Sequence, residues 1–256
     1  MNGEPLEPEP LQDIGKENVD KKETLKEKGV VYFDVGLTQE ERYAMERVQI
    51  EREPKEFDYY GPVNDELVKK LTDYFNRIGD NAEEIINNLS ALVARMADGV
   101  QKDFNAEYCW VNVRTFLPTN EYDIPRWHKD GGYFKSNEEF YKLVFPIKGS
   151  PTRFAKVLDA KRYEKLERED AINNSIRDEN SEEFKKENIR IRKELMEVVE
   201  EIEPPSNEQG ALYTVNNRQT STIHSEPKMH GGSRIFMQVL PGPKEKIEEW
   251  ENRSKK

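Results

Sequence analysis

Cysteine is almost missing from this chain, which has Cys109 as its single cysteine among 256 residues. One thiol cannot form an internal disulfide, and it cannot build a zinc or iron–sulfur site from several cysteines. An unpaired cysteine is typical of a reducing compartment, so we expect a cytoplasmic protein. Cys109 stands between Tyr108 and Trp110 in a β-forming run, which predicts a buried, unreactive thiol.

Long hydrophobic runs are absent as well. No window approaches 18 apolar residues, so the sequence predicts no membrane-spanning helix. The first ten residues, MNGEPLEPEP, have neither the basic start nor the apolar run of a secretory signal. Hydrophobic residues make up 35% of the chain and charged residues 36%, which favours one core with long charged segments over two full cores.

Basic stretches clear of neighbouring acids are also lacking, and the net charge is -11. Because phosphate neutralisation supplies most of the affinity for a nucleic-acid backbone, this balance disfavours a nucleic-acid partner. It leaves a small molecule or a protein side chain as the expected substrate. The sequence contains no GxSxG elbow, no phosphate-binding glycine loop and no GxGxxG motif.

The chain divides into a tail and one expected domain. Residues 1–28 are rich in Glu, Lys, Pro and Asp, and they predict a disordered acidic tail before a single domain at 29–256. Val30 to Phe33 predicts a strand. Three helices then follow from a capping box and from apolar residues at helical spacing. These helices are expected from Thr38 through about Arg52, over 64–77 and over about 82–103.

The second half of the chain is rich in β-formers. Strands are predicted over 107–117, 142–148, 152–158, 210–216, 219–224 and 234–240. Short strands with turn signals between them favour an antiparallel barrel or a double-stranded β-helix, so the fold class is α+β. Residues 160–203 interrupt this pattern as an insertion, because 24 of its 44 residues are charged. An apolar stripe from Phe184 to Ile202 predicts that its second half is a helix.

The first motif with metal-binding chemistry is His128-Lys129-Asp130. In an extended chain, residues i and i+2 point to the same side, so an imidazole and a carboxylate can reach one ion. Gly131 and Gly132 follow, which predicts that the pair lies at the end of a strand.

The second motif ends at His224, the last residue of the predicted strand 219–224. If this strand and 234–240 form a hairpin, His224 and Arg234 become cross-strand neighbours. Two histidines and one carboxylate on one face of an octahedron leave three open positions, which is typical of non-haem Fe(II) oxygenases. His230 is a competing candidate for the second imidazole, but it lies only four residues before Arg234, in an expected turn.

Together these motifs resemble the Fe(II)/2-oxoglutarate-dependent dioxygenases. The resemblance covers about 107–241 and rests on His128, Asp130, His224 and Arg234, ten residues after His224. It implies a double-stranded β-helix core with supporting N-terminal helices, and His128, Asp130 and His224 as the iron ligands. It also implies that 2-oxoglutarate and O2 are cosubstrates, that 2-oxoglutarate is decarboxylated to succinate, and that Arg234 binds its far carboxylate. Because Asp130 is present, hydroxylation is the expected outcome.

The resemblance leaves the second donor to this carboxylate open. Some branches of the family have a hydroxyl two positions after the arginine, where this chain has Phe236. Thr115, Tyr141 and Thr152 lie on nearby predicted strands and are the candidates. Two other functions stay open: a cupin-type metalloprotein that does not use 2-oxoglutarate, and a noncatalytic interaction protein that acts through 160–203. The sequence names neither a substrate nor an oligomeric state.

Overall fold

A computed structural model of the chain describes residues 24–25, 27–52, 56–121, 123–176, 178–217, 219–229 and 231–255. Most of the expected tail lies outside these residues. Near its end, Leu25 has a side chain that is buried in the largest hydrophobic core. The packed structure therefore includes a residue that precedes the expected domain boundary at 29.

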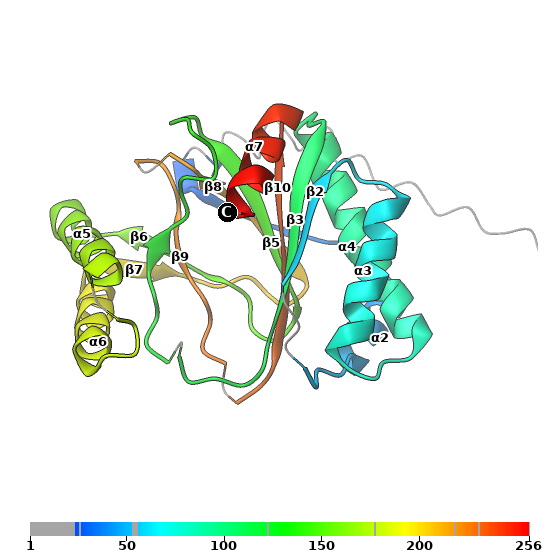
Figure 1. Ribbon diagram of the computed structural model, residues 1–256, viewed down its shortest axis with the longest axis horizontal. Helices are drawn as coiled ribbons and strands as arrows, with labels where there is room; N and C mark the ends of the chain where they lie inside the picture. The colour runs from blue at the N-terminus through cyan, green and yellow to red at the C-terminus, as the bar shows by residue number, and fades with distance from the viewer. Residues whose placement is uncertain are drawn as a thin grey trace, which may run out of the picture.

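The strands form two antiparallel sheets (Figure 1). The six-stranded sheet has the order β1 (Val30–Asp34), β8 (Gln209–Val215), β5 (Phe140–Lys148), β10 (Arg234–Gly242), β3 (Tyr108–Phe116), β2 (Phe57–Gly61). The four-stranded sheet has the order β4 (His128–Lys129), β9 (Ile223–Ser225), β6 (Arg153–Val157), β7 (Val199–Ile202). From β3 onward the chain passes repeatedly from one sheet to the other. This winding is a double-stranded β-helix, so the predicted fold class is confirmed.

Three helices cover the outer face of the six-stranded sheet (Figure 1). They are α2 (Gln39–Arg47), α3 (Asp65–Ile78) and α4 (Glu83–Asp103), close to the three predicted ranges. Thr38 and Glu41 form the expected capping box at the start of α2. This helix ends five residues before the predicted Arg52. The residues after it do not continue the helix, because their backbone N–H groups bond elsewhere. Gln49 donates to Oδ1 of Asn81, and Glu51 and Arg52 both donate to the carbonyl of Ile78 at the end of α3.

Side-chain alternation along the strands separates two faces of the six-stranded sheet. On β3, β5 and β10 the odd-numbered residues pack against α2 to α4, as Val111, Phe145 and Met237 do. The even-numbered residues, such as Trp110 and Val144, face the space between the two sheets. The same strand therefore supplies both a core and the wall of an internal cavity.

The insertion is part of the four-stranded sheet. It contains α5 (Ala160–Ile176), α6 (Glu182–Glu197) and then β7, which pairs with β6. The helix expected in its second half is α6, but Ile202 lies on β7 rather than on that helix. Buried residues of α5 and α6 pack against the outer face of this sheet, at the left of Figure 1.

The expected hairpin between 219–224 and 234–240 is wrong. β9 pairs with β4 and β6, whereas β10 pairs with β3 and β5 in the other sheet. The chain crosses from one sheet to the other between β9 and β10. His224 and Arg234 therefore lie on opposite walls of one cavity. A final helix, α7 (Lys244–Ser254), follows β10 and contributes Trp250 to the cavity wall. Among the described residues, no helix is long and apolar enough to span a membrane.

Candidate metal centre and its cavity

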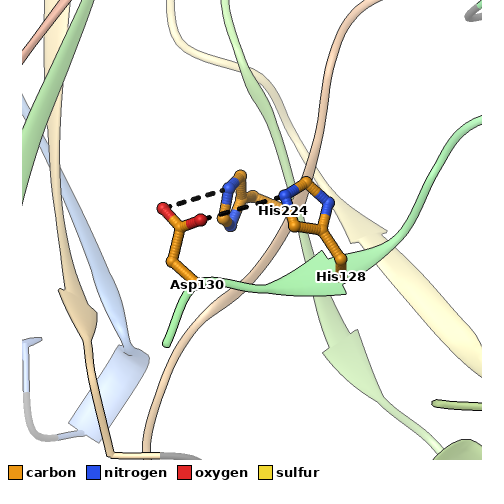
Figure 2. A group of neighbouring side chains, drawn as sticks. All are labelled: His128, Asp130 and His224. Atoms are coloured by element: carbon orange, nitrogen blue, oxygen red, sulfur yellow. Dashed lines mark ion pairs between the residues drawn. The ribbon is translucent and has the colours of Figure 1, made fainter. Parts of the chain in front are cut away.

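Two imidazoles meet where β4 pairs with β9. The register sets His128 directly opposite His224, and their ring centroids are 4.3 Å apart. Asp130 lies two residues after His128 and points to the same side, as the extended backbone requires. Its Oδ1 is 3.9 Å from Nε2 of His128, and its Oδ2 is 3.5 Å from Nε2 of His224. Figure 2 shows the three side chains converging on one point.

One ligand atom from each of these residues lies within 4.8 Å of the other two, so the three can hold one metal ion. Backbone carbonyls orient both rings. Nδ1 of His128 is 2.8 Å from the oxygen of Arg126, and Nδ1 of His224 is 3.3 Å from the oxygen of Thr222. Because a carbonyl only accepts, each Nδ1 carries the proton and each Nε2 keeps a lone pair for a metal.

The charge state of the site suits metal binding. Burial lowers the pKa of His224 to about 4, which keeps this imidazole neutral at ordinary pH. Burial alone would raise the pKa of Asp130, but the nearby Lys142 ammonium holds it well below its usual range. The site therefore offers the neutral imidazole of His224, the imidazole of His128 and one carboxylate, which is a donor set that suits Fe(II).

Lys142 and Tyr213 hold one oxygen of the Asp130 carboxylate. Nζ of Lys142 donates to Oδ2 at 2.8 Å, and the Tyr213 hydroxyl donates to the same oxygen at 2.9 Å. Lys142 is 3% exposed and also donates to the Tyr133 hydroxyl at 2.7 Å. Since Oδ2 receives both donors, Oδ1 is the carboxylate oxygen left for a metal.

Sequence reasoning missed Lys142 and Tyr213 as site residues. A lysine at the start of a strand is typical of a solvent-exposed end. The run of apolar residues after Lys142 could have indicated it, because such a run predicts that β5 is buried on both faces. A polar residue on a strand of this kind is then also expected to be buried. Tyr213 gave no comparable signal, since a tyrosine in a strand fits an ordinary core position.

The three residues line a cavity of about 720 Å³ between the sheets, and Arg234 lines the same cavity. Arg234 is 2% exposed, although it carries a permanent charge. Its Nε donates to the Ser150 carbonyl at 3.0 Å, and its Nη2 donates to the Thr152 hydroxyl at 3.1 Å. Its guanidinium lies 4.3 Å from the centroid of the Phe236 ring. These contacts fix a planar cation that matches a carboxylate in two-point geometry.

Of the three hydroxyl candidates for the second donor, only Thr152 lines this cavity. The Thr115 hydroxyl forms a hydrogen bond of 2.8 Å with that of Tyr74 on α3. The Tyr141 ring stacks on Phe104 with centroids 5.0 Å apart. Both have odd numbers on β3 and β5, so they face the helices, and the structure corrects their expected role. His230, the competing imidazole, lies outside the described residues.

No family model matches the chain, and no curated protein matches it. A dioxygenase for auxin oxidation in rice is 10% identical with a TM-score of 0.46, covering 90% of this chain and 79% of that one. A Pseudomonas putida prolyl-4-hydroxylase is 12% identical with a TM-score of 0.40, covering 94% and 97%.

A third solved structure is HygX from Streptomyces hygroscopicus with nickel and 2-oxoglutarate bound. It is 12% identical with a TM-score of 0.39, and the match covers 88% of this chain and 86% of that one.

Proposed function

We propose that this protein is a non-haem Fe(II)- and 2-oxoglutarate-dependent oxygenase that hydroxylates a small molecule or a protein side chain. The observation that carries the proposal is the placement of His128, Asp130 and His224 around one point, with Arg234 lining the same cavity. Two imidazoles and one carboxylate occupy one face of a cation and leave the opposite face open. A buried arginine nearby supplies the charge that a dicarboxylic cosubstrate requires.

Iron with 2-oxoglutarate bound would supply the oxidising chemistry for insertion of one oxygen atom into a C–H bond. The side chains of this protein position and enclose the reactants. Arg234 and Thr152 would bind the far carboxylate of the cosubstrate. Lys142 and Tyr213 hold Oδ2 of Asp130, which would leave Oδ1 as the ligand atom for the metal. Aromatic side chains from β2, β3 and α7 line the cavity and would limit the access of water to the bound reactants.

Thermal unfolding of the apoprotein without O2 tests both ligands. We expect Mn(II), as a stand-in for Fe(II), to stabilise the wild type by about 2.7 kcal/mol at a hundredfold excess over its Kd. This corresponds to roughly 5–10 °C for a domain of this size. Added 2-oxoglutarate should raise Tm again, because it binds only the folded protein.

Two variants separate the roles of the residues. His128→Ala should lose the response to Mn(II), and Arg234→Gln should keep it but lose the further response to 2-oxoglutarate. Arg42→Gln is the matched control, because Arg42 pairs with Glu208 on the surface and should respond as the wild type does. A wild type that binds Mn(II) but ignores 2-oxoglutarate would instead support the cupin-type alternative. A wild type that ignores both would refute the proposal.

A further inference from the structure

The carboxylates that line the cavity differ in whether they have a cationic partner. They are Glu56, Asp58, Asp130, Glu226 and Glu251. Four of them form ion pairs with cations that also line the cavity, in the pairs Glu56–Arg114, Asp130–Lys142, Glu226–Arg126 and Glu251–Lys255. Asp58 forms no ion pair with any residue that the structure describes. Its charge is the one among these carboxylates that a bound molecule could neutralise.

Neutral donors fix the orientation of Asp58. Its Oδ1 accepts a hydrogen bond from Nε1 of Trp110 at 2.7 Å and another from Nδ2 of Asn112 at 2.9 Å. Asn112 is held in turn, because its Oδ1 accepts from Nε2 of Gln238 at 2.6 Å. The strand register places Gln238, Asn112 and Asp58 in one row across β10, β3 and β2. The carboxylate is thus oriented before any ligand arrives, and no described residue forms a hydrogen bond to its Oδ2.

Aromatic rings stand beside this carboxylate on the same wall. Tyr60 stacks on Trp110 with centroids 6.2 Å apart and planes at 8°. Trp250 from α7 meets Trp110 edge-on at 5.6 Å. The face of an aromatic ring attracts a cation and also packs well against an alkyl chain. An acid next to such a wall fits a positively charged group at the end of an apolar stem.

We infer that the substrate carries an ammonium or guanidinium group that pairs with Asp58 and packs against Tyr60, Trp110 and Trp250. This inference rests on the proposed function, because it names the substrate class of the same cavity. Asp58 lies on β2, three strands away from Lys142 on β5, which holds the ligand Asp130. With about 4.8 Å between strands, the backbones of β2 and β5 are roughly 14 Å apart along the sheet. The side chains are linked through Trp110, whose ring centroid is 5.6 Å from Nζ of Lys142 and whose Nε1 is 2.7 Å from Oδ1 of Asp58. The cationic group of the substrate is therefore bound on the far side of the Trp110 ring from Lys142, away from the oxidised carbon.

Binding of matched probes to the protein loaded with Mn(II) and 2-oxoglutarate tests this inference. One pair is a tripeptide with a central lysine and the same peptide with norleucine. The other pair is octylamine and octanol, which distinguishes a small amine from a basic peptide. Calorimetry should show at least tenfold tighter binding of the cationic member of one pair, with a preference that weakens as salt is added.

Asp58→Asn should abolish this preference, since the amide keeps the shape and the acceptor oxygen but loses the charge. Asp80→Asn is the matched control, because Asp80 is 85% exposed and pairs with Arg52 outside the cavity. Equal binding of charged and neutral probes, no binding of either cationic probe, or an unchanged preference in Asp58→Asn would overturn the inference. The same titrations without Mn(II) and 2-oxoglutarate keep this result separate from a failure of the proposed function.

Discussion

At the scale of single residues, the main feature is the pair of donors on Oδ2 of Asp130. A charged lysine beside a metal ligand has two opposite effects on metal binding. It repels the cation, but it also holds the carboxylate in a single orientation. Hydrogen-bonding partners of metal ligands are typically worth 10–100-fold in metal affinity, so we expect orientation to dominate.

Lys142→Met tests this balance, because methionine has a similar length and no charge. We expect Mn(II) affinity to fall about tenfold or more. Tyr213→Phe removes one donor without changing the charge, and it should weaken Mn(II) binding in the same direction. Lys148→Met is the control on the same strand, since Lys148 follows a β-bulge that reverses the side-chain alternation at the end of β5, and it donates to the Val48 carbonyl on the helix side. Tighter Mn(II) binding by Lys142→Met would show that repulsion of the cation dominates, and unchanged binding would show that the two effects cancel; either result contradicts the prediction.

The buried His224 also predicts a dependence of stability on pH in the metal-free protein. Its pKa is lowered by burial from 6.5 to about 4, so between these values the unfolded chain binds a proton that the folded protein does not. Stability is then complete above about pH 6.5 and is lost as pH falls toward 4. A difference of this size corresponds to about 3 kcal/mol.

Urea unfolding at about pH 7 and about pH 4 measures this loss. In His224→Gln, which has no titrating ring, the difference between the two pH values should be clearly smaller. Glu226 adds to the loss as pH falls from about 4.5 toward 2, because His128 and Arg126 overcome the effect of burial and lower its pKa from 4.5 to about 2, so most of its contribution is lost below pH 4. An equal loss in wild type and His224→Gln would assign the acid sensitivity to other groups.

At the scale of elements, the insertion is a structural part of the sheet that carries His128 and His224 rather than a separate arm. β7 pairs with β6, and β6 pairs with β9, which carries His224. The helices α5 and α6 cover the outer face of that sheet through a cluster that includes Tyr163, Ile191 and Leu195. Loosening α6 should therefore lower the stability of the sheet that holds the ligands.

Two isoleucines on α6 test this coupling. Ile191 is 0% exposed, whereas Ile189 is 45% exposed on the same helix. Ile191→Ala should reduce the free energy of unfolding by about 2–4 kcal/mol, since it leaves a cavity against the sheet. Ile189→Ala should change it by less than about 0.5 kcal/mol. Hydrogen exchange at the backbone amides of β6 and β9 would show whether the effect reaches the metal site, and unchanged protection there would contradict the coupling.

At the scale of the whole molecule, two sheets with different outer coverings enclose one cavity. The six-stranded sheet is covered by α2 to α4 and supplies Arg234, Lys142 and Asp58. The four-stranded sheet is covered by α5 and α6 and supplies His128 and His224. The two proposed histidine ligands and the proposed cosubstrate anchor Arg234 thus lie on opposite walls of the cavity. Residues on strands that do not pair could in this way contact the same cosubstrate.

The sequence by itself determined features that depend on local geometry. The spacing of His128 and Asp130 places both on one side of an extended chain, and Thr38 with Glu41 starts a helix, because these relations involve neighbours only. The alternation of short strands and turns predicts an antiparallel barrel or a double-stranded β-helix, and the resemblance to a known family implies the second. The resemblance to a known family then related His224 and Arg234 to the first pair.

Only the tertiary structure decided which faces meet. Strands buried on both sides have apolar residues at nearly every position, so hydrophobicity cannot say that Thr115 faces the helices while Thr152 faces the cavity. The same ambiguity produced the wrong hairpin, since β9 and β10 are close in sequence but belong to different sheets. The proposed roles of Lys142 and Asp58 depend on hydrogen bonds to Asp130 and Trp110, which are distant in sequence. Such contacts are set by how the strands and sheets pack rather than by any local pattern.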